Sequence, residues 1–210
     1  GQSIGSLPAS RQASGNPTLL AGAFGELVDS KLNPDYYTLA KAGKIFVAAL
    51  AGANPSAFVG GAAGTPLIGI YNPANSGVDL SIIDVMLAIR TTGTVTGNVD
   101  FNFWAVNQGG VAVTGTNTAP RNAYSQAQSG SVATAMLNVA NTAALASNLV
   151  RPSFSLGVVP ASAAAINQVF QDDVKGKLII APGTYLAFGA SAALTGASLD
   201  VALSWAEIPA

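Results

Sequence analysis

Apolar and polar residues alternate along several stretches of this chain, and this period of two constrains the fold more than any other feature of the sequence. Successive side chains of a β-strand point to opposite faces, so such a stretch forms a strand with one buried and one solvent-facing side. Segments 99–105 and 199–205 both show the pattern. In segment 78–91, the face expected to be buried carries Ile83, Val85, Leu87 and Ile89, and the opposite face carries Asp84 and Arg90.

Clusters of Gly, Asn, Pro and Ser separate these segments from other short apolar ones, as expected for strands joined by turns. Because no regular exchange of strands with long helices is visible, the sequence favours a sandwich over a βαβ architecture. It predicts an all-β fold, an antiparallel jelly-roll-like β-sandwich body over residues 46–210 with an extended N-terminal arm. Further strands are expected at 67–71, 131–139, 151–157, 166–170, 176–181 and 184–192. A short helix within 136–152 remains an alternative.

Residues 1–45 differ from the body and are predicted to form the arm. A short helix is expected from Asp35 to Gly43, since a proline and an acidic residue start it and a glycine ends it. Two interpretations of its tyrosines stay open: they cover the body of the same subunit, or they dock onto a neighbour. The arm residues expected to make assembly contacts are Leu27, Leu32, Tyr36, Tyr37, Leu39 and Phe46.

Charged residues are scarce: 9 Lys and Arg and 10 Asp and Glu make up 9% of the 210 residues, where about 25% is usual. Such a surface is weakly protected against association, so we expect much of it to contact other protein. A net charge of −1 without a basic run argues against direct binding of nucleic acid. No secretory signal is visible, and prolines and glycines interrupt the apolar stretch 45–70, so we expect a soluble chain without a membrane segment.

The chain contains no histidine and no cysteine, which removes the commonest general base, the commonest transition-metal ligand and every thiol nucleophile. Asp172 and Asp173 are the only adjacent acids, and the sequence around them is typical of a polar turn between two strands, with a calcium or substrate site as the alternative. We therefore expect no catalytic site, no cofactor and no metal. A glycosidase-like pair of distant carboxylates is the surviving enzymatic alternative.

The two tryptophans differ in their position on the alternating pattern. Trp205 lies on the apolar face of its segment, which favours core packing, whereas Trp104 lies on the polar face. Tyr124 belongs to the long polar segment 107–130. Trp104 and Tyr124 are therefore the expected surface contacts, either with a sugar or with another subunit.

Four segments together resemble a group of tailed-bacteriophage virion structural proteins, the jelly-roll proteins that decorate or cement the capsid. They are GELVDSKLNPDYYTLAKAGKIF (25–46), IYNPANSGVDLSIIDVMLAIR (70–90), IIAPGTYLAFGASAAL (179–194) and LDVALSWAEIP (199–209).

The resemblance implies a capsid decoration (cement) protein on the surface of the virion, made in the host cytoplasm. Its implied partners are sister subunits, often in a homotrimer, and the major capsid protein of a phage head. The alternative from a different class is a phage tail or fibre receptor-binding module. That module would recognise host-surface glycan through Trp104, Tyr124 and segment 107–130.

Overall fold

The computed structural model describes residues 36–53, 66–91, 98–107, 116–128, 130–137, 147–157, 168–194 and 196–210. The chain divides into two units, residues 1–38 and 39–210. The expected arm contacts Leu27 and Leu32 lie outside the described residues. A single helix is described, α2 (Tyr37–Lys41), at the place where the sequence predicts a short one.

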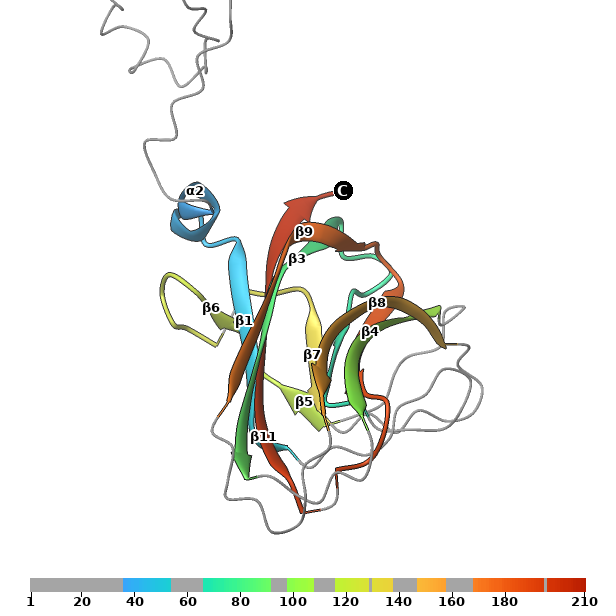
Figure 1. Ribbon diagram of the computed structural model, residues 1–210. Helices are drawn as coiled ribbons and strands as arrows, with labels where there is room; N and C mark the ends of the chain where they lie inside the picture. Colours follow the sequence, from blue (N-terminus) through green and yellow to red (C-terminus); the bar gives the residue numbers. More distant parts are fainter. Residues whose placement is uncertain are drawn as a thin grey trace, which may run out of the picture. The chain divides into compact units, whose positions relative to one another are not determined.

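Eight strands of the second unit pair like one long antiparallel hairpin that has been rolled up (Figure 1). The first of the eight strands pairs with the last, the second with the second-last, and so on to the two middle strands. This is the jelly-roll topology. The predicted all-β sandwich is thereby confirmed. The pairs are β1 (Ile45–Ala53) with β11 (Ser198–Pro209), β2 (Ile68–Tyr71) with β10 (Thr184–Ala190), β3 (Val78–Thr91) with β9 (Val169–Ile180), and β4 (Val99–Asn107) with β8 (Ser147–Leu156).

These strands form a five-stranded sheet in the order β6-β1-β11-β3-β9 and a six-stranded sheet in the order β5-β7-β2-β10-β4-β8. The three additional strands are β5 (Thr116–Thr118), β6 (Arg121–Asn122) and β7 (Thr134–Leu137). The first two lie in the segment expected to be a long loop. We call residues 116–137 the crossover segment, because β5 and β7 belong to one sheet and β6 to the other.

The crossover segment closes one edge of the sandwich through main-chain hydrogen bonds. β7 pairs with β2 and β6 pairs with β1, so the segment extends both sheets. A buried carboxylate adds a further tie: Glu207 of β11 accepts hydrogen bonds from the Ser131 hydroxyl at 2.6 Å and from the Val132 N–H at 3.0 Å. The carboxylate is thus satisfied although only 4% of Glu207 is exposed.

The opposite edge, between β8 and β9, is closed by side chains. The Asp172 carboxylate accepts hydrogen bonds from Arg151 Nη2 at 2.6 Å and from Ser153 Oγ at 2.7 Å, and the rings of Phe154 and Phe170 lie 5.5 Å apart. The interpretation of Asp172 as part of a solvated turn is therefore wrong.

β9 runs without interruption from Val169 to Ile180 and joins two strands that were expected separately. Lys175 and Gly176 both have positive φ, 53° and 74°, so they form a bulge that absorbs the irregular register between β9 and β3. Polar residues and a glycine gave this bulge the appearance of a turn.

Apolar side chains of the alternating pattern from both sheets form one core cluster. Within the six-stranded sheet, the ring centroids of Phe188 and Phe103 are 5.0 Å apart, and within the five-stranded sheet those of Phe46 and Trp205 are 6.3 Å apart. The core position predicted for Trp205 is confirmed. Phe46, expected among the assembly contacts of the arm, lies in β1 and is 2% exposed. This expectation is wrong because its ring packs against Trp205 in the core.

Strand β3 departs from strict alternation at Ile83. The pairing with β11 joins Ser204 to Asp84 and Trp205 to Ile82, so Ile83 is an extra residue in a bulge. The bulge reverses the alternation before it, and Ile82 rather than Ile83 is fully buried in the core. Val85, Leu87 and Ile89 face the core as predicted.

Two turns of the sandwich are joined by one buried asparagine. Asn72 Nδ2 donates to the carbonyl oxygens of Val78 at 2.8 Å and Ile180 at 2.9 Å, which links the turn after β2 to the end of β9. The N–H of Gly183, whose φ of 80° suits glycine, donates to the Asn72 carbonyl at 2.7 Å.

The ambiguous segment 136–152 ends in strands. β7 covers its first residues and β8 its last. Residues 138–146, where the alternative helix would have to lie, are outside the described residues.

Candidate binding surface on the five-stranded sheet

The outer face of the five-stranded sheet, the side away from the core, is formed by cross-strand rows of side chains. Residues that pair directly across strands point to the same face. One row crosses every strand of the sheet in the order Arg121, Val47, Ser204, Asp84, Asp173. The next row contains Ala49, Ala202, Met86 and Gln171. In the row after that, Asp200 pairs with Ala88 and Ala88 with Val169.

Small side chains leave an apolar hollow in the middle of this face. Its floor is made largely of alanines, among them Ala49, Ala88 and Ala202, and its volume is about 390 Å³. Met86 and Val169 also line it, and they are 40% and 68% exposed. A contiguous apolar surface open to solvent is typical of sites that contact other protein.

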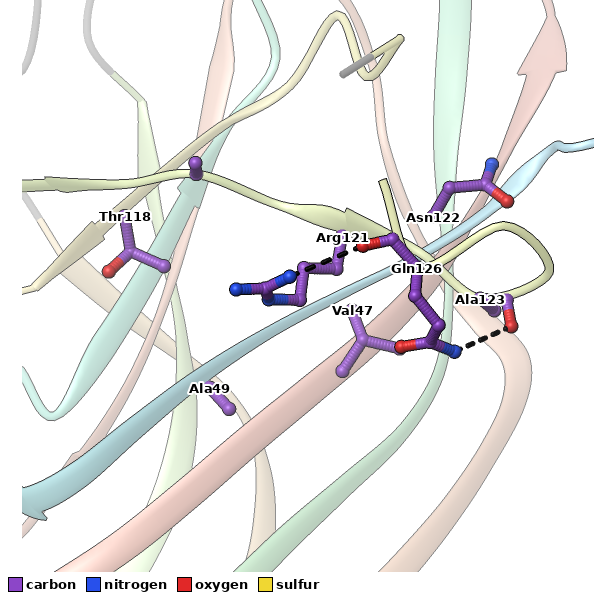
Figure 2. Close-up of a pocket in the computed structure, with 8 residues that line it drawn as sticks. Val47, Ala49, Thr118, Arg121, Asn122, Ala123 and Gln126 are labelled. Atoms are coloured by element: carbon purple, nitrogen blue, oxygen red, sulfur yellow. Dashed lines mark hydrogen bonds between the residues drawn. The ribbon is translucent and has the colours of Figure 1, made fainter. Parts of the chain in front are cut away.

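A second hollow adjoins the first at the β6 end of the face (Figure 2). Its volume is about 280 Å³, and Ala49 lines both hollows. Figure 2 shows Val47 and Ala49 coming from β1, and Arg121 and Gln126 coming from the crossover segment. Arg121 Nη1 donates to the Gln126 carbonyl oxygen at 3.2 Å, so this hollow has an apolar floor and a polar, cationic rim.

The rim is fixed by the buried side chain of Asn122. Its Oδ1 accepts hydrogen bonds from the N–H groups of Tyr124 at 3.0 Å and Ser125 at 3.1 Å, and its Nδ2 donates to the Gly43 carbonyl at 2.7 Å. This asparagine turn holds residues 122–127 against the start of β1. Arg121 is therefore presented from an ordered support.

Charge is distributed unevenly along the first row. Arg121 lies at the β6 end, whereas Asp84 and Asp173 are paired neighbours at the β9 end. Asp84 accepts a hydrogen bond from Ser204, and Asp173 accepts one from Gln171 at 3.2 Å. Within the part of the chain that the structure describes, none of the three charges forms an ion pair, and neither do Lys175 and Lys177 further along β9.

The remaining charge on this face is neutralised locally. Arg90 Nε lies 3.5 Å from Asp200 Oδ2, and Asp200 Oδ1 also accepts a hydrogen bond from the N–H of Gly52 at 2.8 Å. Among the described residues, unpaired charge therefore remains at Arg121, Asp84 and Asp173 in the first row, and at Lys175 and Lys177 further along β9.

The two surface contacts expected from the sequence, Trp104 and Tyr124, do not form one site. Trp104 is only 8% exposed, so its assignment to the surface is wrong: it points to the outer side of the six-stranded sheet, which is buried around Trp104, Tyr185 and Ala187. Tyr124 is 58% exposed. Lys41 Nζ lies 3.4 Å from its hydroxyl and 4.9 Å from its ring centroid, which is a cation–π contact between the end of α2 and the crossover segment.

Of the residues expected to make assembly contacts, Tyr37 is exposed and Leu39 partly exposed, and Tyr36 precedes α2 with a φ of 66°.

The sequence places Asp84 and Arg90 on the solvent-facing side of their segment and singles out Asp173 as one of two adjacent acids, but it does not indicate that residues of several strands form one surface. Arg121, Met86 and Asp173 are far apart along the chain, and only the register across five strands places them on one surface. Three of the four pairings contain bulges or other irregularities, which shift the register without a clear sequence signal.

The described ranges contain no group of three or more acidic side chains placed to hold a metal ion. Among the same residues, no helix has the length and apolar character needed to cross a membrane. No model of a known protein family matches this chain, and no curated protein matches it.

Proposed function

We propose that this chain is a non-catalytic structural protein of a phage virion, which decorates and stabilises the head through contacts between protein subunits. The observation that carries the proposal is the outer face of the five-stranded sheet. It combines an ordered sheet, an apolar hollow of about 390 Å³ and exposed Met86 and Val169.

The physical argument is one of surface area. Covering apolar surface contributes about 25 cal/mol per Å², and a stable interface buries about 800 Å² on each partner. A chain with 19 charged side chains among 210 residues leaves much of its exterior suited to such contacts. Each added contact across a capsid would oppose the internal pressure of packaged DNA, and no active site is needed for this.

Two observations support the assignment of this chain to a virion. One is the jelly-roll topology, which viral capsid proteins share with lectins and cupins, and the other is the resemblance of the four segments described above. Because the fold alone does not determine function, the proposal depends on the exposed face together with that resemblance. The proposed partners are other copies of this chain and the major capsid protein.

The test mixes the full chain with expanded, DNA-free phage heads. Saturable binding and a higher temperature of head disruption are expected. Met86→Lys should weaken binding, because it places a charge in the apolar hollow. Leu149→Lys is the matched control, since Leu149 is 54% exposed on β8, away from this face.

Two results would contradict the proposal. One is the absence of binding to heads. The other is binding to host cells or to their surface glycans, lost on Tyr124→Ala, which would favour the receptor-binding alternative. Burial of Trp104 has already removed one of the two aromatic residues on which that alternative depended.

A further inference from the structure

The charged row on the outer face has opposite ends. Arg121 lies on β6, the first strand of the five-stranded sheet, and Asp173 lies on β9, the last, with Asp84 next to it on β3. β11 is the middle strand and carries Ser204 in the same row. In this row the positions are symmetric about β11 and the charges at the two ends are opposite, whereas Lys175 and Lys177 lie further along β9, outside the row.

We propose that a second copy of this chain docks on this face, related by a two-fold axis that runs parallel to the strands over β11. The inference rests on the proposed packing function of the outer face and names its partner. A two-fold contact is isologous, so each surface must complement itself. It also differs from the trimer that the resemblance implies.

The charges select the direction of the axis. A rotation about an axis along β11 places β6 of one copy over β9 of the other, and β1 over β3. Arg121 then lies opposite Asp173 of the second copy, twice in the interface, with Asp84 adjacent. A two-fold axis across the strands would instead place Arg121 opposite Arg121, and like charges facing each other cost several kcal/mol.

The apolar row fits the same axis. Met86 on β3 is then opposite Ala49 on β1 of the second copy, since both belong to one row. Met86 is 40% exposed, and Ala49 lines the hollow. An unbranched, polarizable methionine adapts well to such a space, so a protruding side chain meets a depression on each side of the axis.

Strand β11 would face its own counterpart, and its outward side chains allow a close approach. Ala202 and Ser204 are small. Asp200 would face Asp200, but Arg90 at 3.5 Å and the Gly52 N–H at 2.8 Å compensate its charge. No uncompensated repulsion therefore lies on the axis.

The face is large enough for a specific dimer of modest size. Four of its strands, β1, β11, β3 and β9, lie about 4.8 Å apart and span about 19 Å, and about nine residues of each span about 30 Å, which gives roughly 580 Å² on each copy. The two-residue strand β6 adds little to this area. A standard interface buries about 800 Å² on each partner. Two sheets packed in this way keep their strands within about 30° of each other, as in the interior of a sandwich.

The first experiment measures self-association of the full chain by sedimentation velocity over a range of concentrations, without phage heads. A reversible dimer is expected. Arg121→Asp and Asp173→Arg should each raise the dimer dissociation constant on the order of a hundredfold, because each places like charges in contact. The double variant should restore the dimer, since both contacts are then reversed together. Circular dichroism checks that each variant is folded.

The second experiment distinguishes face-to-face docking from edge-to-edge docking, in which β6 of one copy would meet β9 of the next. The chain has no cysteine, so Ala202→Cys introduces a single thiol near the proposed axis. A short bis-maleimide should link two such chains in high yield. Leu149→Cys, on β8 of the other sheet, is the control and should remain unlinked.

Three outcomes would overturn the inference: a monomer at all concentrations, a trimer or open chain without a dimer, or a dimer that forms no Ala202→Cys cross-link. A monomeric chain that still binds heads, and loses that binding on Met86→Lys, would assign the face to the capsid instead. The proposed function would then stand while this inference fails. A dimer that binds no heads would support this inference and contradict the proposed function.

Discussion

The outer faces of the two sheets differ in a way that separates stability from association. On the six-stranded sheet, Tyr185, Ala187 and Trp104 point away from the core cluster and yet are 3%, 0% and 8% exposed. On the five-stranded sheet, Met86 and Val169 occupy the corresponding side and are 40% and 68% exposed. The middle of the six-stranded sheet is therefore buried on both sides, although Leu149 on its edge strand β8 is 54% exposed. The five-stranded sheet has one side open.

The sequences of the central strands reflect this difference. β10, in the six-stranded sheet, is buried at every position from Tyr185 to Ala190, whereas β11, in the five-stranded sheet, alternates between buried and partly exposed positions from Ser198 to Trp205. Strands covered on both faces are continuously apolar, and strands covered on one face alternate. Substitutions on the first outer face should therefore affect folding, and those on the second should affect contacts with other molecules.

The largest expected effect is that of Trp104→Ala. Removing a buried indole leaves a cavity, so the free energy of unfolding should fall by about 3–5 kcal/mol, as measured by urea denaturation. Met86→Ala is the matched change on the open face and should cost less than about 1 kcal/mol. Equal losses in the two variants would show that the open face is also part of the folded core.

A smaller effect is expected from Gly69→Ala on β2. A Cβ atom there would lie 1.7 Å from Tyr185 Oη and 2.3 Å from Cζ. The buried ring has to move, and such overpacking should cost about 2 kcal/mol. Gly157→Ala is the control, because an added Cβ there meets no atom within 4 Å. If both variants unfold at the same urea concentration, the tyrosine does not pack on the strand as described.

The smallest effect concerns alkaline pH. Burial raises the pKa of the Tyr185 hydroxyl above its ordinary value of 10.0, and the hydroxyl has no hydrogen-bond partner among the described residues. Above pH 10 the unfolded chain releases this proton while the folded chain retains it. This contribution to stability is fully present below pH 10 and falls by about 1.4 kcal/mol per pH unit above it.

Urea denaturation of the original chain and of Tyr185→Phe, at about pH 9 and about pH 11, isolates this contribution. The phenylalanine variant should lose less stability between the two pH values. At neutral pH it should be at least as stable as the original, because an unsatisfied buried hydroxyl is removed. The same loss in both proteins would contradict the burial of this group.

The parts of the fold that follow from local pattern could be predicted from the sequence. The alternation in β4 and β11 and the turns around Asn72 and Gly183 indicated an antiparallel sandwich. The bulges could not be predicted in this way. In β3, one extra residue at Ile83 reverses the face of the residues before it without changing the composition. In β9, the irregular stretch around Lys175 has the composition of a turn. Trp104 was misplaced for another reason: alternation tells which residues share a face, not whether that face is covered.

The sequence predicts the solvent-facing side of single strands, such as Asp84 and Arg90 in β3, but not the surface that the strands form together. Arg121, Ser204 and Asp173 meet in one row only through pairings among five strands. This register between distant strands depends on the positions of bulges and on the order of strands in the sheet. Neither can be predicted from the pattern of a single sequence. The scarcity of charged residues predicts contacts with other protein but not their position on the fold.

The crossover segment has a mechanical consequence. Its backbone leaves one layer at Thr118, bonds to the other at Arg121, and returns at Thr134. Sliding one layer past the other by a single residue would break these ladders and pull the Glu207 carboxylate away from Ser131. A force that pulls one sheet along the other is therefore also resisted by the covalent backbone of the crossover segment, and not by side-chain packing alone.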